Sequence, residues 1–172
     1  MEYFIPLNGW AASGRKEFRW KADTEFFQQF DNQEILEADV VIDAVAVKAG
    51  EALEVDLEVR GHVTVSCDRC LGDLELPVDA HPRLSIRLDG ETSAGEMSQE
   101  GEREVLLPDA SDTDMDLRQV IYDYVCLSLP MQKVHPEGKC DPETVKFLCQ
   151  GAGNEEAAPS SPFAALKGLF KE

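Results

Sequence analysis

The chain lacks the long apolar run that would suit it to a membrane and the excess of basic residues that would suit it to a nucleic acid. Its 172 residues include 34 acidic and 16 basic side chains, which gives a formal net charge of −18. Such a charge repels phosphate backbones and argues against an autonomous DNA- or RNA-binding domain. No stretch approaches the roughly 18 apolar residues of a membrane helix, and the N-terminus lacks the features of a signal peptide. We therefore expect a cytoplasmic protein with no membrane or DNA partner.

The common sequence motifs of catalytic sites are also missing. No Gly-rich phosphate loop, no H-E-x-x-H and no G-x-S-x-G occurs. His62 and His81 have no Ser, Cys or carboxylate at a spacing that indicates a catalytic triad, so both are expected to be surface or edge residues. The carboxylates are so numerous that no pair stands out as an acid and a base. The sequence therefore predicts a protein that is not an enzyme.

The alternation of apolar and polar residues predicts an antiparallel sheet. Residues 53–60 alternate strictly between apolar and charged side chains, as in a half-buried strand. The pattern continues to Cys67, and after turn residues at 68–73 it resumes at Leu74, so a long hairpin is expected. Upstream, residues 35–51 end in a Gly-containing turn that would fold them back onto this hairpin. An antiparallel meander follows from these short connections.

Two segments predict helices that cover the sheet. Residues 23–30 offer Asp23 or Thr24 as an N-cap, followed by phenylalanines suited to covering one end of a sheet. Residues 116 to about 128 have one apolar face, and Asp116 with Gln119 fits a capping box. The length and the 43% hydrophobic content suit a single domain. We expect an α+β domain over residues 1–149, an antiparallel β-meander or partly closed sheet with about two helices on one face or end.

The rest of the chain is acidic or has the composition of a linker. Residues 89–116 contain ten acidic residues and one basic residue, which predicts an acidic mobile loop over 89–115 with a short strand at 104–107. Residues 150–162 have the composition of a flexible linker. In the short amphipathic tail at 163–172, the apolar side chains share one stripe, which we expect to bind a partner. These side chains are Phe163, Leu166, Leu169 and Phe170.

The cysteines carry the sharpest local signal. An odd number of cysteines, five, in a chain without an export signal favours thiols or metal ligands over a disulfide framework. Cys67 and Cys70 form a C-x-x-C at the hairpin tip, where a tight turn would project both thiolates toward one point, as tetrahedral zinc requires. His135 and Cys140 bracket a proline and a glycine that can turn the chain, so they can supply the other two ligands. These four residues form a candidate structural zinc site.

Other interpretations of the cysteines stay open. Cys67 and Cys70 would also fit ordinary free cysteines at a turn or a redox pair. A redox pair is the weakest of these because a reactive C-x-x-C usually lies at a helix N-terminus, whereas strands flank this one. Cys126, opposite the apolar face of its helix, and Cys149, at the edge of the linker, are predicted to be bystanders.

A single basic and aromatic cluster leaves direct contact with RNA open. Its members are Arg15, Lys16, Arg19 and Lys21, interleaved with Phe18 and Trp20. Four cations alone offer at most weak, salt-sensitive binding.

The combination of motifs resembles the bacterial YceD family, whose members are also described as large ribosomal RNA subunit accumulation proteins. The segments that carry the resemblance are S-C-D-R-C-L, D-L and L-S-L-P-M at residues 66–71, 116–117 and 127–131, followed by His135 and Cys140. The ending at 162–167 is similar to the tail of Bacteroidetes-type members. The resemblance implies a non-enzymatic factor that supports large-subunit ribosomal RNA accumulation during ribosome assembly. Relatives are typically encoded beside a small basic zinc-ribbon protein of the large subunit.

The sequence departs from the family pattern in two places. Many relatives carry a glutamate where this chain has Cys126, and many have a further C-x-x-C in the second motif that this chain lacks. A metal site here would therefore consist of Cys67, Cys70, His135 and Cys140 alone.

Charge and resemblance together predict the partner. A large-subunit ribosomal precursor, or a basic large-subunit ribosomal protein, would be attracted by the acidic loop. The alternative hypothesis is a small cysteine-based metal-handling or redox-responsive protein.

Overall fold

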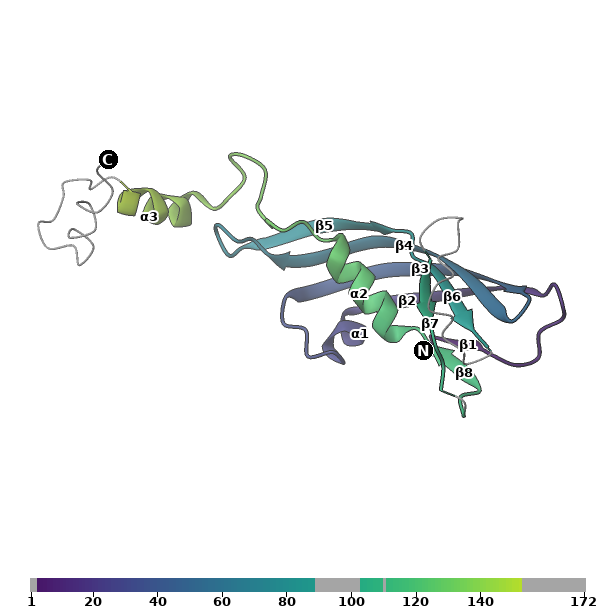
Figure 1. Cartoon of the computed structure of the whole chain (residues 1–172). Coiled ribbons are helices and arrows are strands. Elements are labelled where there is room, and N and C mark those ends of the chain that lie inside the picture. The colour runs from purple at the N-terminus through teal and green to yellow at the C-terminus, as the bar shows by residue number, and fades with distance from the viewer. Residues whose placement is uncertain (1–2, 89–102, 110, 153–172) are drawn as a thin grey trace, which may run out of the picture.

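The computed structural model describes residues 3–88, 103–109 and 111–152 of the chain. It is an α+β structure with one large twisted sheet (Figure 1). Its elements in chain order are β1 Phe4–Pro6, β2 Arg15–Asp23, α1 Thr24–Gln28, β3 Ile35–Ala49, β4 Ala52–Ser66, β5 Asp73–Ala80, β6 Arg83–Arg87, β7 Glu104–Leu106, β8 Asp114–Asp116, α2 Arg118–Ser128 and α3 Pro142–Ala152.

The long strand β4 organises the sheet. One edge of β4 pairs antiparallel with β3, and the other edge pairs with β6 along its first part and with β5 along its last part. The change of partner occurs at the break after β5, where the Pro82 carbonyl accepts a hydrogen bond from the Leu57 N–H (2.9 Å). The strand order is β2-β3-β4-β6-β7, with β5 beside β4, and the sheet is not closed. The predicted antiparallel meander is confirmed for β3, β4 and β5, and β2, which was not predicted, extends it on the other side of β3.

Two pairings were not expected. β7 pairs parallel to β6, an arrangement for which the sequence gives no signal. β1 and β8 form a separate two-stranded sheet that joins the start of the chain to residues 114–116. β7 and β8 both lie in the acidic segment. β7 agrees with the short strand expected at 104–107, whereas residues 89–102 lie outside the described residues.

The core lies between one face of the sheet and the helices. The apolar side chains of residues 53–59 are buried on that face, as their alternation predicts. Phe26 and Phe27 of α1 and Ile121 of α2 are buried against it. Tyr122 stacks on Phe30, with ring centroids 4.4 Å apart, and so joins the two helical segments. α2 runs across the sheet in Figure 1.

The two predicted helices are present, but only one has the predicted cap. Asp23 caps α1, because its carboxylate accepts a hydrogen bond from the Phe26 N–H (3.1 Å). The capping box predicted at α2 is wrong: Leu117 is the N-cap residue and makes no side-chain cap hydrogen bond. The Asp116 carboxylate instead binds the backbone and guanidinium of Arg118, while Gln119 donates to Asp123. Asp116 ends β8, which holds it before the first turn of the helix.

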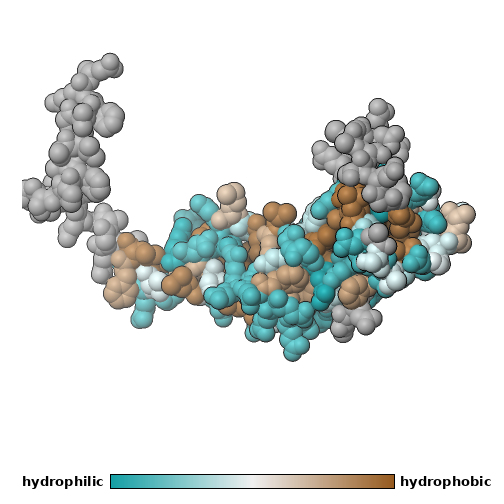
Figure 2. All heavy atoms as spheres, turned by 60° about the horizontal axis from the view of Figure 1, so that its bottom comes forward, coloured by the Kyte–Doolittle hydropathy of each residue, from teal (hydrophilic) through white to brown (hydrophobic). Residues whose placement is uncertain are grey.

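α3 was not predicted, although the sequence signals its start. Asp141 precedes Pro142 and Glu143, which is the usual pattern of an N-cap, a proline at the first helical position and an acidic first turn. α3 continues to Ala152, so the first three residues of the predicted linker at 150–162 are helical. The helix stands beyond the end of the sheet in Figure 1, and hydrophobic residues gather on it in Figure 2. The tail at 163–172 lies outside the described residues.

No helix in the described ranges combines the length and the apolar character needed to cross a membrane.

Candidate metal centre

The β4–β5 turn holds Cys67 and Cys70 on its inner side. The Cys67 N–H donates to the Gly72 carbonyl (2.8 Å), and the Leu71 N–H donates back to the Cys67 carbonyl (2.9 Å). Leu71 has a φ of 58°, a left-handed conformation that lets the turn close. Cys67 is fully buried and Cys70 is 8% exposed. The turn therefore gives both thiols a buried position near one point.

A second segment is clasped onto this turn through hydrogen bonds of Asp68. The Asp68 N–H donates to the Lys133 carbonyl (2.7 Å), and the Lys133 N–H donates to the Asp68 carboxylate (2.7 Å). The Lys133 ammonium pairs with Glu34, the residue just before β3. These three contacts, which we call the Asp68 clasp, place the segment that follows α2 over the hairpin tip. His135 and Cys140 lie on that segment.

The predicted convergence of the four residues is confirmed. The ligand atoms of Cys67, Cys70, His135 and Cys140 all lie within 4.8 Å of one another. The His135 Nδ1 atom is 3.4 Å from the Cys70 sulfur and 4.0 Å from the Cys140 sulfur. The Cys67 and Cys140 sulfurs are thus brought together from segments that are distant in sequence.

His135 is oriented by the backbone. Its Nε2 atom lies 3.0 Å from the Asp73 carbonyl oxygen, which can only accept a hydrogen bond. The proton of the neutral ring therefore lies on Nε2, and Nδ1 presents its lone pair to the thiols. Such an outer hydrogen bond fixes the tautomer of a metal-binding histidine.

Backbone N–H groups support negative charge on two of the sulfurs. Burial raises the pKa of Cys67, but hydrogen bonds from the N–H groups of Cys70, Arg69 and His135 outweigh it and lower the pKa to about 6. The N–H groups of Asp141 and of the turn glycine lower the pKa of Cys70. Both sulfurs are thus held in an environment that favours the thiolate, the form that binds metals.

The other two groups titrate together with these thiols. Burial, followed by the side chains of Cys70 and Cys67, raises the pKa of Cys140. Interaction with the Cys67 side chain, and then the Asp73 carbonyl, raises the pKa of His135. The protonation states of the four groups therefore depend on one another, and an ion that displaces the protons would act on all four.

The donor set fits zinc. Three thiols and one imidazole nitrogen are a usual ligand set of structural zinc sites, and bonds of about 2.3 Å put neighbouring sulfurs of a tetrahedron about 3.8 Å apart. Separations of up to 4.8 Å need only small side-chain adjustments to reach this geometry. Cys67, Cys70, His135 and Cys140 would hold the ion, and the Asp73 carbonyl would orient the histidine.

The remaining predicted residues lie elsewhere. Cys126 is not part of the cluster; it is partly buried, with its sulfur 3.9 Å from the Asn32 amide nitrogen. The side chain of Cys149 and the four apolar residues of the tail lie outside the described side chains. His62 and His81 are exposed, as expected, and His81 contacts Asp79 (3.2 Å).

The basic and aromatic cluster is divided between the two faces of β2. Its aromatic side chains, Phe18 and Trp20, stack on the face toward the core, where Lys16 also lies over the Trp10 ring. Three cations on the other face pair with carboxylates: Arg15 with Glu17, Arg19 with Asp43 and Lys21 with Asp39. The alternation of side chains along a strand accounts for this separation over residues 15–23. The cluster is therefore not a continuous cationic and aromatic surface.

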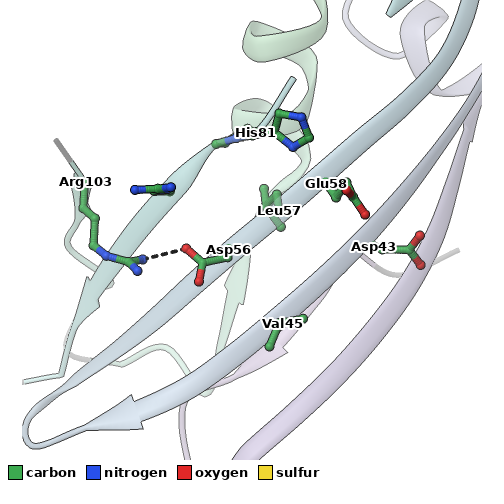
Figure 3. A pocket seen from close by; sticks show the side chains of 9 residues that line it. Asp43, Val45, Asp56, Leu57, Glu58, His81 and Arg103 are labelled. Atoms are coloured by element: carbon green, nitrogen blue, oxygen red, sulfur yellow. Dashed lines mark ion pairs between the residues drawn. The ribbon is translucent and has the colours of Figure 1, made fainter. Parts of the chain in front are cut away.

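An open groove of about 550 Å³ lies on the sheet face away from the helices, beside β3 and β4 (Figure 3). Its carboxylates are each paired with an arginine: Asp43 with Arg19, Asp56 with Arg103 and Glu58 with Arg60. In Figure 3, Arg103 reaches across to Asp56. These pairs neutralise the groove, and its histidine, His81, is exposed beside Asp79.

Comparison with known families gives the chain an identity. The family model described as large ribosomal RNA subunit accumulation protein YceD matches residues 55–170, which include all four members of the cluster. The chain belongs to the YceD family. The description of the YceD family links it to accumulation of the large ribosomal RNA subunit. Neither the comparison with curated proteins nor that with solved structures finds a match.

Proposed function

We propose that this protein supports accumulation of large-subunit ribosomal RNA by binding a basic component of the assembling large subunit, without catalysing a reaction. The observation that carries the proposal is the match to the YceD family over residues 55–170. The partner would be a large-subunit precursor or one of its basic ribosomal proteins. Because ribosomes assemble there, the expected location is the cytoplasm.

The distribution of charge supports a basic partner. The net charge is −18, and half of it comes from residues 89–116. Within the described part of that segment, Asp109, Asp112 and Asp114 are exposed, and their neighbours in the segment donate hydrogen bonds to two of them. The carboxylates of the sheet groove, by contrast, already pair with arginines. The acidic segment thus offers unneutralised negative charge to a partner.

A protein partner suits this charge better than RNA. Phosphate backbones would be repelled by the net charge. The cations of β2, which offered the best local RNA contact in the sequence, pair with carboxylates of the same sheet. Contact with ribosomal RNA would therefore be indirect, through the basic protein. The tail side chains Phe163, Leu166, Leu169 and Phe170 would add an apolar contact to the same partner.

We also propose a structural zinc ion at Cys67, Cys70, His135 and Cys140. The burial of both C-x-x-C sulfurs supports a structural role over the alternative of a metal-handling or redox-responsive protein, because exchange and thiol chemistry need access from solvent. A metal assay with a parallel thiol titration separates the two. About one zinc per chain with protected thiols is the structural result, whereas reactive thiols without metal would favour the redox alternative.

The cellular role is tested by removing the gene and measuring the ratio of large-subunit to small-subunit ribosomal RNA. We expect the ratio to fall and to recover when the full chain is restored. A variant chain in which Asp109, Asp112 and Asp114 are replaced by asparagine tests the role of the acidic segment. It should recover the ratio less well than the unaltered chain. An unchanged ratio in cells without the gene would contradict the proposed function.

A further inference from the structure

The helix that follows the fourth cluster residue has no partner within the described chain. No other helix or strand of the described ranges packs closely against α3, which stands apart from the sheet and from α2 (Figure 1). Its side chains Phe147 and Leu148 are 76% and 54% exposed. Two adjacent large apolar side chains that are exposed on a helix without a packing partner form a candidate interaction surface. In Figure 2 hydrophobic residues gather at this end of the described chain.

Other exposed apolar residues belong to the same end of the molecule. Leu71 is 75% exposed at the tip of the β4–β5 turn, and Met131 is fully exposed on the segment that the Asp68 clasp holds. Both lie on the segments that carry the cluster residues. The cluster is therefore flanked on each of its segments by apolar side chains that face solvent.

α3 is attached to the domain through the cluster. Asp141 directly follows Cys140, the last residue of the cluster in the sequence. The carboxylate of the same residue caps α3, accepting hydrogen bonds from the Thr144 N–H (3.1 Å) and hydroxyl (2.6 Å) and from the Glu143 N–H (3.3 Å). One residue thus connects the sulfur cluster to the first turn of the helix. A change that opens the cluster would therefore loosen the attachment of α3 to the domain.

We propose that α3 is a docking arm, anchored by the metal centre, whose Phe147 and Leu148 bind an apolar groove on a basic large-subunit ribosomal protein. The inference rests on the proposed function for the class of partner. Apolar side chains on a helix fit a hydrophobic groove of a protein. The net charge of −18 favours a basic protein and disfavours RNA as the occupant. The metal centre would set the position of the arm, and the apolar side chains would supply the contact.

The test is capture of large-subunit proteins from an RNase-treated lysate by the full chain loaded with zinc. The double variant F147A/L148A should reduce capture about tenfold or more, because exposed anchors at the centre of an interface carry much of its binding energy. The matched control is V105A/L107A, which removes side chains that are 55% and 45% exposed at a distance in the fold. It should capture like the wild type.

A second arm of the test removes the metal. Wild-type protein stripped by a chelator should lose capture by a similar factor and regain it when zinc is added back. The variant F147A/L148A should not regain capture when zinc is added back, since it lacks the apolar side chains that contact the partner.

Three results would overturn the docking arm. The first is wild-type capture by F147A/L148A. The second is a Tm lowered by several degrees in that variant with capture unchanged, which would mean that α3 packs on its own chain. The third is capture that RNase abolishes, which would make RNA the occupant. A wild-type chain that captures no large-subunit component with or without RNase would instead contradict the proposed function.

Discussion

At the scale of single residues, the metal centre depends on the backbone as much as on its four ligands. The N–H groups that lower the pKa of Cys67 belong to the β4–β5 turn and to His135 itself. The Asp73 carbonyl sets the tautomer of the histidine. Ligand identity could be predicted from the sequence because cysteine and histidine spacing is local and chemically specific. The backbone groups that support the ligands could not be predicted from the sequence, since almost every residue has a backbone N–H and a carbonyl.

Loss of one ligand should remove the metal and part of the stability. We expect Cys70→Ser to lose zinc binding and to lower the Tm by roughly 10 °C or more, because metal-binding free energy is also folding free energy when only the native state holds the site. The control is Cys126→Ser, which alters a sulfur outside the cluster. Zinc content by mass spectrometry and thermal unfolding are the measurements. Equal zinc content in the two variants would contradict the assignment of ligands.

The Asp68 clasp should preorganise the centre without touching the ion. Asp68→Ala removes the acceptor of the Lys133 N–H, so the segment with His135 and Cys140 loses part of its hold on the turn. We expect zinc affinity to fall about 10- to 100-fold, as for other outer contacts of metal sites. Competition with a chelator of known affinity measures it. Asp68→Asn keeps an acceptor oxygen and should stay near the wild type, and an alanine variant with unchanged affinity would show that the clasp is dispensable.

At the scale of elements, the hairpin follows from local pattern, and the irregular pairings do not. The alternation at residues 53–60 predicts which side chains of β4 are buried, because each strand residue faces the side opposite to its neighbours. β1 and β8 have three residues each and no periodicity to detect. β8 also explains the failed capping box. Its pairing with β1 holds Asp116 opposite Phe4, within the strand. Asp116 therefore lies one residue before the actual N-cap, Leu117, and does not serve as the N-cap that the sequence pattern predicts.

Gly61 is the point at which β3 and β4 approach too closely for a side chain. A Cβ atom there would lie 2.1 Å from the Asp39 carbonyl oxygen and 2.7 Å from the Val40 Cα. Gly61→Ala should therefore force the strands apart and destabilise the protein by about 2–4 kcal/mol. Gly50→Ala is the control. It has a positive φ but no atom within 4 Å of the added Cβ, so it should cost about 1 kcal/mol. Urea unfolding that gives equal losses for the two variants would contradict the steric account.

At the scale of the whole molecule, charge is sorted by location. Arginines of the sheet pair with its carboxylates, as in the groove of Figure 3, whereas the segment 89–116 carries a large excess of negative charge. The sign of the net charge could be predicted from the amino-acid composition alone. The ion pairs of the sheet could not be predicted in this way, because Arg19 lies beside Asp43 only through the register of β2 on β3. The same limit applied to the metal centre, where the sequence supplied two half-sites and the fold joined them.

Binding to the assembling large subunit can be measured by a pull-down from growing cells with the full zinc-loaded chain as bait, scored for large-subunit against small-subunit precursors. The pull-down is made at ionic strengths from about 0.05 to 0.5 M, over which the screening length shortens severalfold. We expect enrichment of large-subunit precursors at low salt and progressive loss as salt rises, because the net charge of −18 attracts a basic component. Equal recovery of both subunits' precursors, or a large-subunit enrichment that salt does not change, would contradict this expectation.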